Sequence, residues 1–156
     1  MTEGEVALVR EVFGEAIDAS RVMVRRRKWF PFQPRRVTMA PTGHLHFHPR
    51  SENYCDDFSQ ASLEMQAHFI HETTHVWQTQ TKGWWYLPLH RPFSRRYDYS
   101  IVPGWKLADY GIEQQAEIVR HAFMAMHGKP AIGAPPLAVY RQILPFRGDA
   151  EKIAAD

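Results

Sequence analysis

The sequence has almost no cysteine and no long hydrophobic run. Cys55 is the one cysteine among 156 residues, which excludes an internal disulfide and a cysteine-based zinc site. No apolar stretch reaches the roughly 20 residues that a transmembrane helix needs. The first residues, MTEGEVALVREVFGEAIDAS, carry acids throughout, which is not typical of a secretory signal. We therefore expect no membrane partner and a cytoplasmic location by default, with signal-independent secretion as the alternative.

An excess of one charge is also missing, since the formal net charge is only +2. One basic cluster stands beside aromatic residues that offer stacking surfaces, a combination that can attract a nucleic acid. No nucleic-acid motif accompanies the cluster, so we expect no nucleic-acid partner. A solvated face, or a surface for an acidic partner, is the interpretation we favour. The cluster comprises Arg21, Arg25, Arg26, Arg27, Lys28, Arg35 and Arg36, and the aromatic residues are Trp29, Phe30 and Phe32.

The most informative motif is HETTH, residues 71–75, which matches the HExxH pattern of zinc metalloproteases. Positions four apart share a helix face, so the imidazoles of His71 and His75 can converge on one metal ion. Glu72 projects near the open side of that ion, where a carboxylate can take a proton from bound water. Such a short pattern arises by chance in roughly three of a hundred shuffled sequences, so its context must decide.

The context is helical. The segment from Ser59 to Thr81 contains no Gly or Pro, Asp57 and Ser59 are candidate N-caps, and Gly83 follows as a stop signal. Apolar residues recur at helical spacing and predict a core-facing stripe, which consists of Leu63, Ala67, Ile70, Thr74 and Trp77.

A catalytic zinc usually has a third protein ligand. The metzincin pattern is absent, because Gln78 and Thr81 stand where its Gly and its third His would be. A second helix is predicted over 109–127, where Glu113 and Glu117 lie one turn apart beside an apolar stripe. Carboxylates beside a core stripe are costly unless they are paired or bound to a cation, which makes both of them ligand candidates.

With these motifs the chain resembles the gluzincins, metallopeptidases that combine HExxH with a downstream Glu. The resemblance implies a zincin-like fold, Glu113 as the third ligand, and Glu117 as the carboxylate that orients His71. The second acid is Glu rather than the more usual Asp, so the order of the two roles stays open. HETTHVWQ, YDYS and DYGIEQQAEIV more closely resemble small bacterial zincin-like proteins, some of them labelled Vgr- or Rhs-related. This resemblance spans Leu63 to His127.

Between the two predicted helices, residues 83–108 form an aromatic-rich segment that is broken by prolines. Either the segment is an irregular packed loop, which we favour, or some of its aromatic residues wall a substrate cleft. These aromatic residues are Trp84, Trp85, Tyr86, Phe93, Tyr97, Tyr99 and Trp105. Zincin hydrolysis also needs a donor for the oxyanion, and the candidates are Tyr97, Tyr99, Tyr110, His90 and His121.

Three histidines, His44, His46 and His48, alternate in sequence. On a strand they share one face and can bind a transition metal. We favour a partly exposed strand face, since no acidic or cysteine partner is adjacent. His68 precedes the motif by one turn, and we expect ordinary packing for it.

Together these features predict an α+β protein: a minimal zincin-like domain whose small N-terminal sheet or hairpin packs on the HExxH helix and on a second, Glu-bearing helix. We expect a single domain over 1–156. Its expected segments are an N-terminal helix at 1–20, strands at 21–50 including a hairpin over 37–48, the HExxH helix at 57–82, the aromatic loop at 83–108, the Glu-bearing helix at 109–127, and a linker, short helix and charged tail at 128–156.

The predicted function is that of a zinc metallopeptidase, a hydrolase acting on a peptide or protein substrate. One zinc ion held by His71, His75 and Glu113 would activate a water molecule, and Glu72 would act as general base. The alternative is a non-catalytic zincin-fold adaptor, or an accessory protein of a secretion system, with a structural metal site. A plain helix without metal is a third interpretation, which leaves the shared spacing of His71, His75, Glu113 and Glu117 unexplained.

Overall fold

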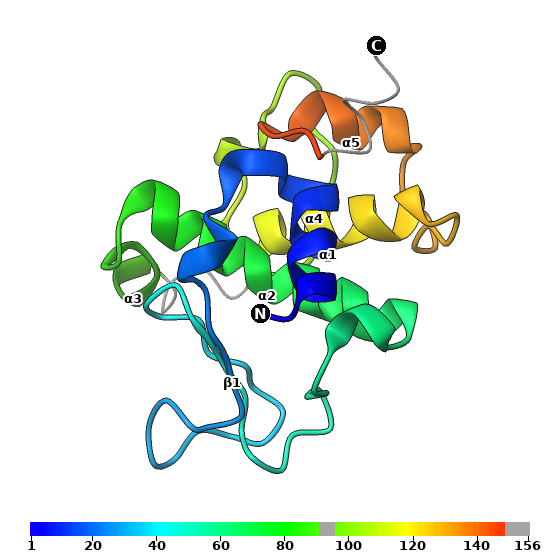
Figure 1. The fold of residues 1–156 in the computed structure, drawn as a ribbon. Coiled ribbons are helices and arrows are strands. Elements are labelled where there is room, and N and C mark those ends of the chain that lie inside the picture. The colour runs from blue at the N-terminus through cyan, green and yellow to red at the C-terminus, as the bar shows by residue number, and fades with distance from the viewer. Residues whose placement is uncertain (91–95, 149–156) are drawn as a thin grey trace.

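The structure is a computed structural model that describes residues 1–90 and 96–148 (Figure 1). It confirms the α+β class: the fold is mostly helical, with one small parallel sheet. Phe93 and the charged tail at 149–156 lie outside the described residues, and the assignment of the chain to a single domain stays a prediction. The elements are α1 (Glu3–Phe13), β1 (Val24–Arg25), β2 (Leu45–His46), α2 (Leu63–Lys82), α3 (Tyr86–His90), α4 (Ile112–Met126) and α5 (Leu137–Ile143), with 3-10 turns at Gly14–Ala16, Ala19–Arg21, Phe58–Gln60 and Leu107–Asp109.

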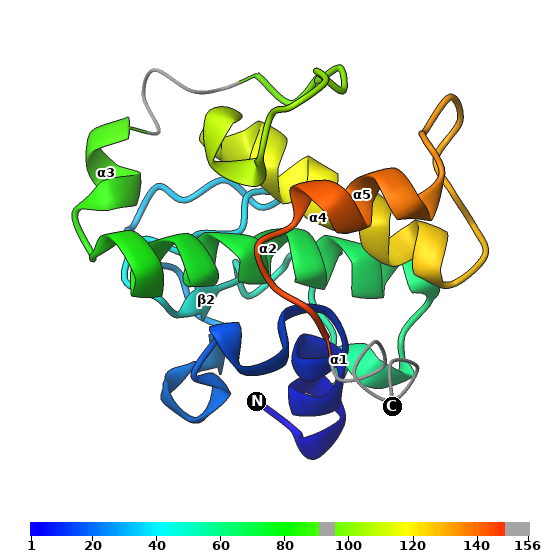
Figure 2. The same cartoon turned by 90° about the horizontal axis from the view of Figure 1, so that it is seen from above.

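Helix α2 forms the centre of the molecule. In Figure 2 it lies between α4 and α5 on one side and α1 with β2 on the other. Every side chain from Phe69 to Val76 is buried, so the middle of this helix is enclosed around its whole circumference. The HETTH residues therefore lie in the interior, where polar groups must find partners.

The ends of α2 follow from local chemistry. Ser62 is the N-cap, and its side chain accepts a hydrogen bond from the backbone N–H of Met65. Asp57, a predicted cap, instead caps the preceding 3-10 turn through the N–H of Ser59. At the other end Gly83 adopts a φ of 91°, which glycine tolerates best. The stop at Gly83 is thus confirmed, whereas the predicted start was several residues too early.

Helix α4 packs against α2 more extensively than any other element does. The facing residues Ala116, Val119 and Phe123 are fully or almost fully buried, as the apolar stripe predicts. Helix α5 packs on α4 in turn. This pairing sets the turn of α4 that carries Glu113 opposite the HETTH turn of α2.

The β structure is smaller than predicted. Strand β1 pairs with β2 in parallel, Val24 with Leu45 and Arg25 with His46. The predicted hairpin over 37–48 is reduced to one antiparallel bridge between Met39 and His46. The intervening chain turns at Phe30–Gln33 and Pro34–Val37, and prolines at these turns offer no N–H for a ladder.

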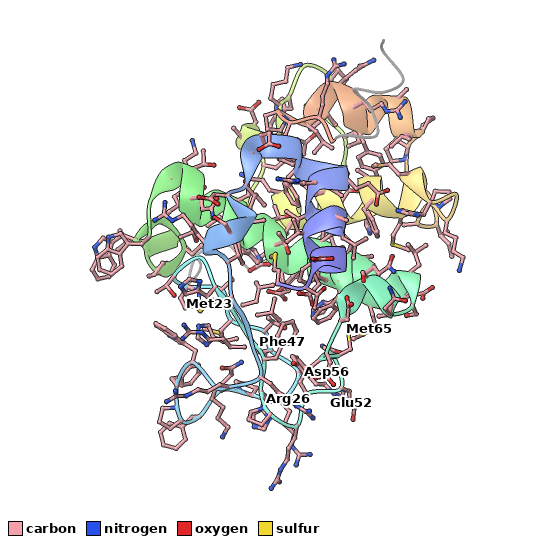
Figure 3. The ribbon with its side chains drawn as sticks, viewed as in Figure 1. Met23, Arg26, Phe47, Glu52, Asp56 and Met65 are labelled. Carbon is pink, nitrogen blue, oxygen red and sulfur yellow. The ribbon has the colours of Figure 1, made fainter. Side chains whose placement is uncertain are left out.

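A cluster of aromatic rings joins the β segment to α2. Phe58 stacks on Phe69 of α2, with ring centroids 4.7 Å apart, and it lies 5.3 Å from the Phe47 ring. Tyr54 lies edge-on to Phe47 at 5.6 Å and is covered by the Arg26 guanidinium at 5.0 Å. Figure 3 shows Arg26 at the same end of the molecule as Glu52 and Asp56. We call Phe47, Tyr54, Phe58 and Phe69 the aromatic cluster.

Several other expectations need correction. The N-terminal helix ends at Phe13, because Gly14 turns the chain with a φ of 54°. The aromatic segment is not wholly irregular, since it contains the short helix α3. His46 and His48 are buried rather than partly exposed, because the chain folds over this strand and the Trp29 ring covers His46. Among the described residues, no helix combines the length and apolarity that crossing a bilayer requires.

Candidate metal centre

Three buried side chains from α2 and α4 converge on one point. One ligand atom each from His71, His75 and Glu113 lies within 4.8 Å of the others. Glu113 Oε2 is 3.2 Å from His75 Nε2 and 3.4 Å from His71 Nε2. One carboxylate oxygen thus faces the Nε2 atoms of both imidazoles, the convergence that the helical spacing predicts.

A hydrogen-bond network fixes the orientation of the His75 ring. The amide nitrogen of Gln78 donates to the Ile112 carbonyl oxygen at 3.0 Å and to Gln115 Oε1 at 2.9 Å. The amide oxygen of Gln78 therefore faces His75 Nδ1, at 2.8 Å, and that nitrogen must be the donor. In the neutral imidazole the Nε2 lone pair then points at Glu113. This network is what a metal ligand requires, because it leaves Nε2 free to coordinate.

His71 has a carboxylate on each side of its ring. Its Nδ1 lies 2.8 Å from Glu117 Oε1, an ion-pair distance without the alignment of a hydrogen bond. Burial by itself lowers the pKa of His71, but Glu113 and Glu117 outweigh burial and raise that pKa to about 9. Burial likewise raises the pKa of Glu117, and the adjacent His71 more than reverses this, to about 2. His71 and Glu117 thus form an ion pair at neutral pH.

The three residues fit a bound cation. Each is at most 6% exposed, and a neutral His75 with its Nδ1–H directed at Gln78 presents the Nε2 lone pair to the Glu113 carboxylate oxygen. A metal ion between His75 Nε2 and Glu113 Oε2 would remove this conflict, whereas a proton on His71 would satisfy only the contact between His71 and Glu113. Two imidazole nitrogens and one carboxylate oxygen are also a common catalytic ligand set for zinc.

Glu72 lies beside this cluster with an unused oxygen. The residue is 6% exposed, and its Oε2 is buried without a hydrogen-bond partner among the described residues. Its Oε1 lies 3.8 Å from His68 Nε2, too far for a hydrogen bond. A buried carboxylate oxygen without a hydrogen-bond partner lowers the stability of the folded state. Glu72 is therefore suited to accept a hydrogen bond from a water molecule on a bound metal ion.

A cavity of about 400 Å³ opens onto this side of the cluster. Of the predicted donors, Tyr97 reaches it, and its ring stacks over His71 with centroids 6.2 Å apart. The other side of the cavity is formed by the loop before Met39 and by α4. The complete lining consists of Arg36, Val37, Thr38, His68, His71, Glu72, Tyr97, Glu117 and Arg120.

Other predicted donors lie farther from the cluster. Tyr99 and His121 line a neighbouring cavity of about 540 Å³, where the Tyr99 hydroxyl contacts His121 Nδ1 at 2.7 Å. Burial, more than the hydrogen bond to Tyr140, raises the pKa of Tyr99. Tyr110 is buried, and its hydroxyl accepts the N–H of Val102 at 3.1 Å.

Sequence reasoning missed four neighbours of the cluster. Gln78 was noted only as a departure from the metzincin pattern, although its spacing of three from His75 was a usable signal. His68 lines the cavity in addition to packing. Arg36 belongs to the predicted basic cluster, but neither Arg36 nor Arg120 carried a local signal for this cavity, because the cavity forms only where the loop meets α4. The tryptophans Trp84 and Trp85 line a separate apolar cavity with Trp29.

An α+β fold built around a buried His–His–Glu cluster, with a glutamate poised beside it, defines a domain with a candidate metal centre. No family model matches the chain. The type VI secretion system spike protein VgrG2b of Pseudomonas aeruginosa is 39% identical over 130 residues, which cover 80% of this chain and 13% of that protein.

The solved effector domain of Pseudomonas aeruginosa VgrG2b is 36% identical, with a TM-score of 0.75 over 92% of this chain and 82% of that one. The chain therefore belongs to the family of the VgrG2b effector domain. This confirms the resemblance to Vgr-related proteins, whereas the gluzincin assignment stays an interpretation. The chain spans only 13% of the full-length spike protein.

Proposed function

We propose that this chain acts as an effector domain associated with a type VI secretion system, and that the His71–His75–Glu113 cluster is its catalytic zinc centre for peptide hydrolysis. Membership of the VgrG2b effector-domain family supports the first part. The second part depends above all on Glu72, whose buried, unpartnered oxygen lies beside three convergent ligand atoms and an open cavity.

In this proposal His71, His75 and Glu113 hold the ion, while Glu117 and Gln78 fix the two imidazole rings. A zinc ion held by these three residues would supply a Lewis acid, which lowers the pKa of a water ligand toward neutrality. The free oxygen of Glu72 would hold the proton that leaves the attacking water and would pass it to the amine as the peptide C–N bond breaks. Tyr97, which lines the same cavity, is the candidate oxyanion donor.

The first test combines metal content with turnover. We expect close to one zinc per chain by mass spectrometry of protein that was purified without chelator or histidine tag. Glu72→Gln should keep the zinc but lose hydrolysis of a peptide mixture by about 100- to 10,000-fold. Glu64→Gln, which alters an exposed glutamate on the same helix, is the matched control and should keep both. Loss of zinc in Glu72→Gln, or full activity, would contradict the assigned role.

A secretion-associated accessory role with a structural metal is the second candidate. The observation that favours it is the burial of all three ligands, since structural zinc sites are closed. In that case chelation would lower the melting temperature, and the zinc-loaded wild type would cleave no peptide in the mixture. Binding of a zinc-chelating hydroxamate would separate the two, because only an open coordination position accepts it.

A further inference from the structure

The cavity over Glu72 carries two arginines that the proposed mechanism does not use. Arg36 comes from the loop before Met39, and Arg120 comes from α4. They reach the same cavity from segments far apart in the chain, and the lining of that cavity also includes His71 and Glu72. The cavity thus places positive charge beside the candidate metal centre.

The carboxylates that line the cavity do not neutralise the positive charges of both Arg36 and Arg120. Arg120 Nη1 lies 3.2 Å from Glu117 Oε1, but that carboxylate also serves His71 at 2.8 Å and His121 at 3.4 Å. The Nε of Arg120 is buried and has no hydrogen-bond partner within residues 1–90 and 96–148. The Arg36 guanidinium makes no ion pair or hydrogen bond with the described residues. Glu72, the remaining acid, is assigned to proton transfer.

We propose that Arg36 and Arg120 select substrates that carry a carboxylate next to the scissile bond, either an acidic side chain or a free C-terminus. The proposal rests on the proposed function, because it places the substrate in that cavity. Guanidinium groups bind carboxylates through paired N–H donors. A partly enclosed cavity strengthens this attraction relative to open solvent.

The test measures binding rather than turnover, so that it does not depend on hydrolysis. Three succinyl hydroxamates are compared on zinc-loaded protein by calorimetry: one coupled to glutamate amide, one to glutamine amide and one to glutamine with a free terminal carboxylate. We expect at least one carboxylate ligand to bind about tenfold more tightly than the neutral glutamine amide. If the glutamate amide ligand binds more tightly, the cavity recognises an acidic side chain. If the ligand with the free terminal carboxylate binds more tightly, the cavity recognises a C-terminus.

Variants assign the effect to the arginines. Arg36→Gln should abolish the preference, and Arg36→Glu should reverse it in favour of the neutral ligand. Arg120→Lys, which keeps the charge beside Glu117, should weaken the preference through loss of the paired donors. Arg35→Gln is the matched control, because Arg35 is adjacent and exposed but does not line the cavity, and it should keep the wild-type preference.

Three outcomes would overturn the inference: equal binding of all three ligands to the wild type, a preference that survives Arg36→Gln, or no hydroxamate binding at all by zinc-loaded protein. The proposed peptidase function fails separately. If the carboxylate preference follows Arg36 but no peptide is hydrolysed, the cavity recognises carboxylates without cutting, and only the catalytic proposal is lost.

Discussion

The two sides of α2 are stabilised by different physics. Toward α4, the helix presents His71 and His75 to the buried carboxylate of Glu113, an arrangement that a bound cation would stabilise. Toward the β segment it presents Phe69 to the stacked ring of Phe58, an arrangement that depends on dispersion and apolar burial. The comparison teaches that the residues of a candidate site and the residues that stabilise the fold can lie on opposite sides of one helix. The side toward α4 carries the candidate metal ligands, and the side toward the β segment carries the aromatic contact that stabilises the fold.

The largest effect that should distinguish the two sides is loss of the metal. Glu113→Ala removes one of the three convergent ligands, so zinc affinity should fall by roughly a thousandfold. This factor corresponds to about 4 kcal/mol, roughly a third of the 10–16 kcal/mol typical of structural zinc sites. Competition with a chromophoric chelator measures the affinity. Glu64→Ala is the control, and the aromatic cluster should stay intact by near-ultraviolet circular dichroism. A collapsed spectrum in Glu113→Ala would show that the two sides are not separable.

The opposite perturbation is Phe58→Ala. Removal of a fully buried ring from the aromatic cluster should lower the free energy of unfolding by about 3–5 kcal/mol, as measured by urea denaturation. At temperatures where the variant stays folded, its zinc affinity should match that of the wild type. Phe30→Ala, which alters an exposed phenylalanine, should leave both quantities unchanged. A large drop in zinc affinity for the folded Phe58→Ala protein would contradict the division between the two sides.

A smaller effect is expected from Gln78→Leu, which keeps the ligands but removes the acceptor of His75 Nδ1–H. Loss of such an orienting partner should weaken zinc binding by about 10- to 100-fold. Gln80→Leu is the matched control, because Gln80 lies on the same helix but bonds only to Asp18. Equal affinities for the two variants would mean that packing alone orients His75.

The smallest effect is that of a change of one pH unit. Because the pKa of His71 is raised to about 9 in the metal-free protein, this ring carries a proton at neutral pH that zinc must displace. Zinc affinity should therefore increase about tenfold per pH unit between pH 6 and 8. The increase should level off above the pKa. An affinity that does not change over this range would show that His71 is already neutral.

Helical periodicity explains why much of the site could be predicted from the sequence. His71 and His75 had to share a face of α2, and Glu113 and Glu117 had to share a face of α4. The stop at Gly83 followed from its conformational freedom. The contacts that could not be predicted join segments that are distant in the sequence. The amide nitrogen of Gln78, for example, donates to Ile112 and Gln115 across the helix pair.

The β segment shows the limit of local patterns. Alternation over His44–His48 predicted an exposed strand face, but the loop that carries Trp29 covers His46. Alternation fixes which residues share a face and leaves open what later covers that face. The same loop brings Arg36 to the cavity, so the inferred specificity depends on a contact without a sequence signature.

The enclosure of α2 also determines how the molecule opens. The backbone amides from Phe69 to Val76 are shielded on every side, so their hydrogens exchange with deuterium only when α1 or α4 separates from α2. These amides should be among the slowest to exchange in the protein. We therefore expect His71 and His75 to belong to the part of the chain that unfolds last, so that partial unfolding at the periphery leaves their relative positions intact.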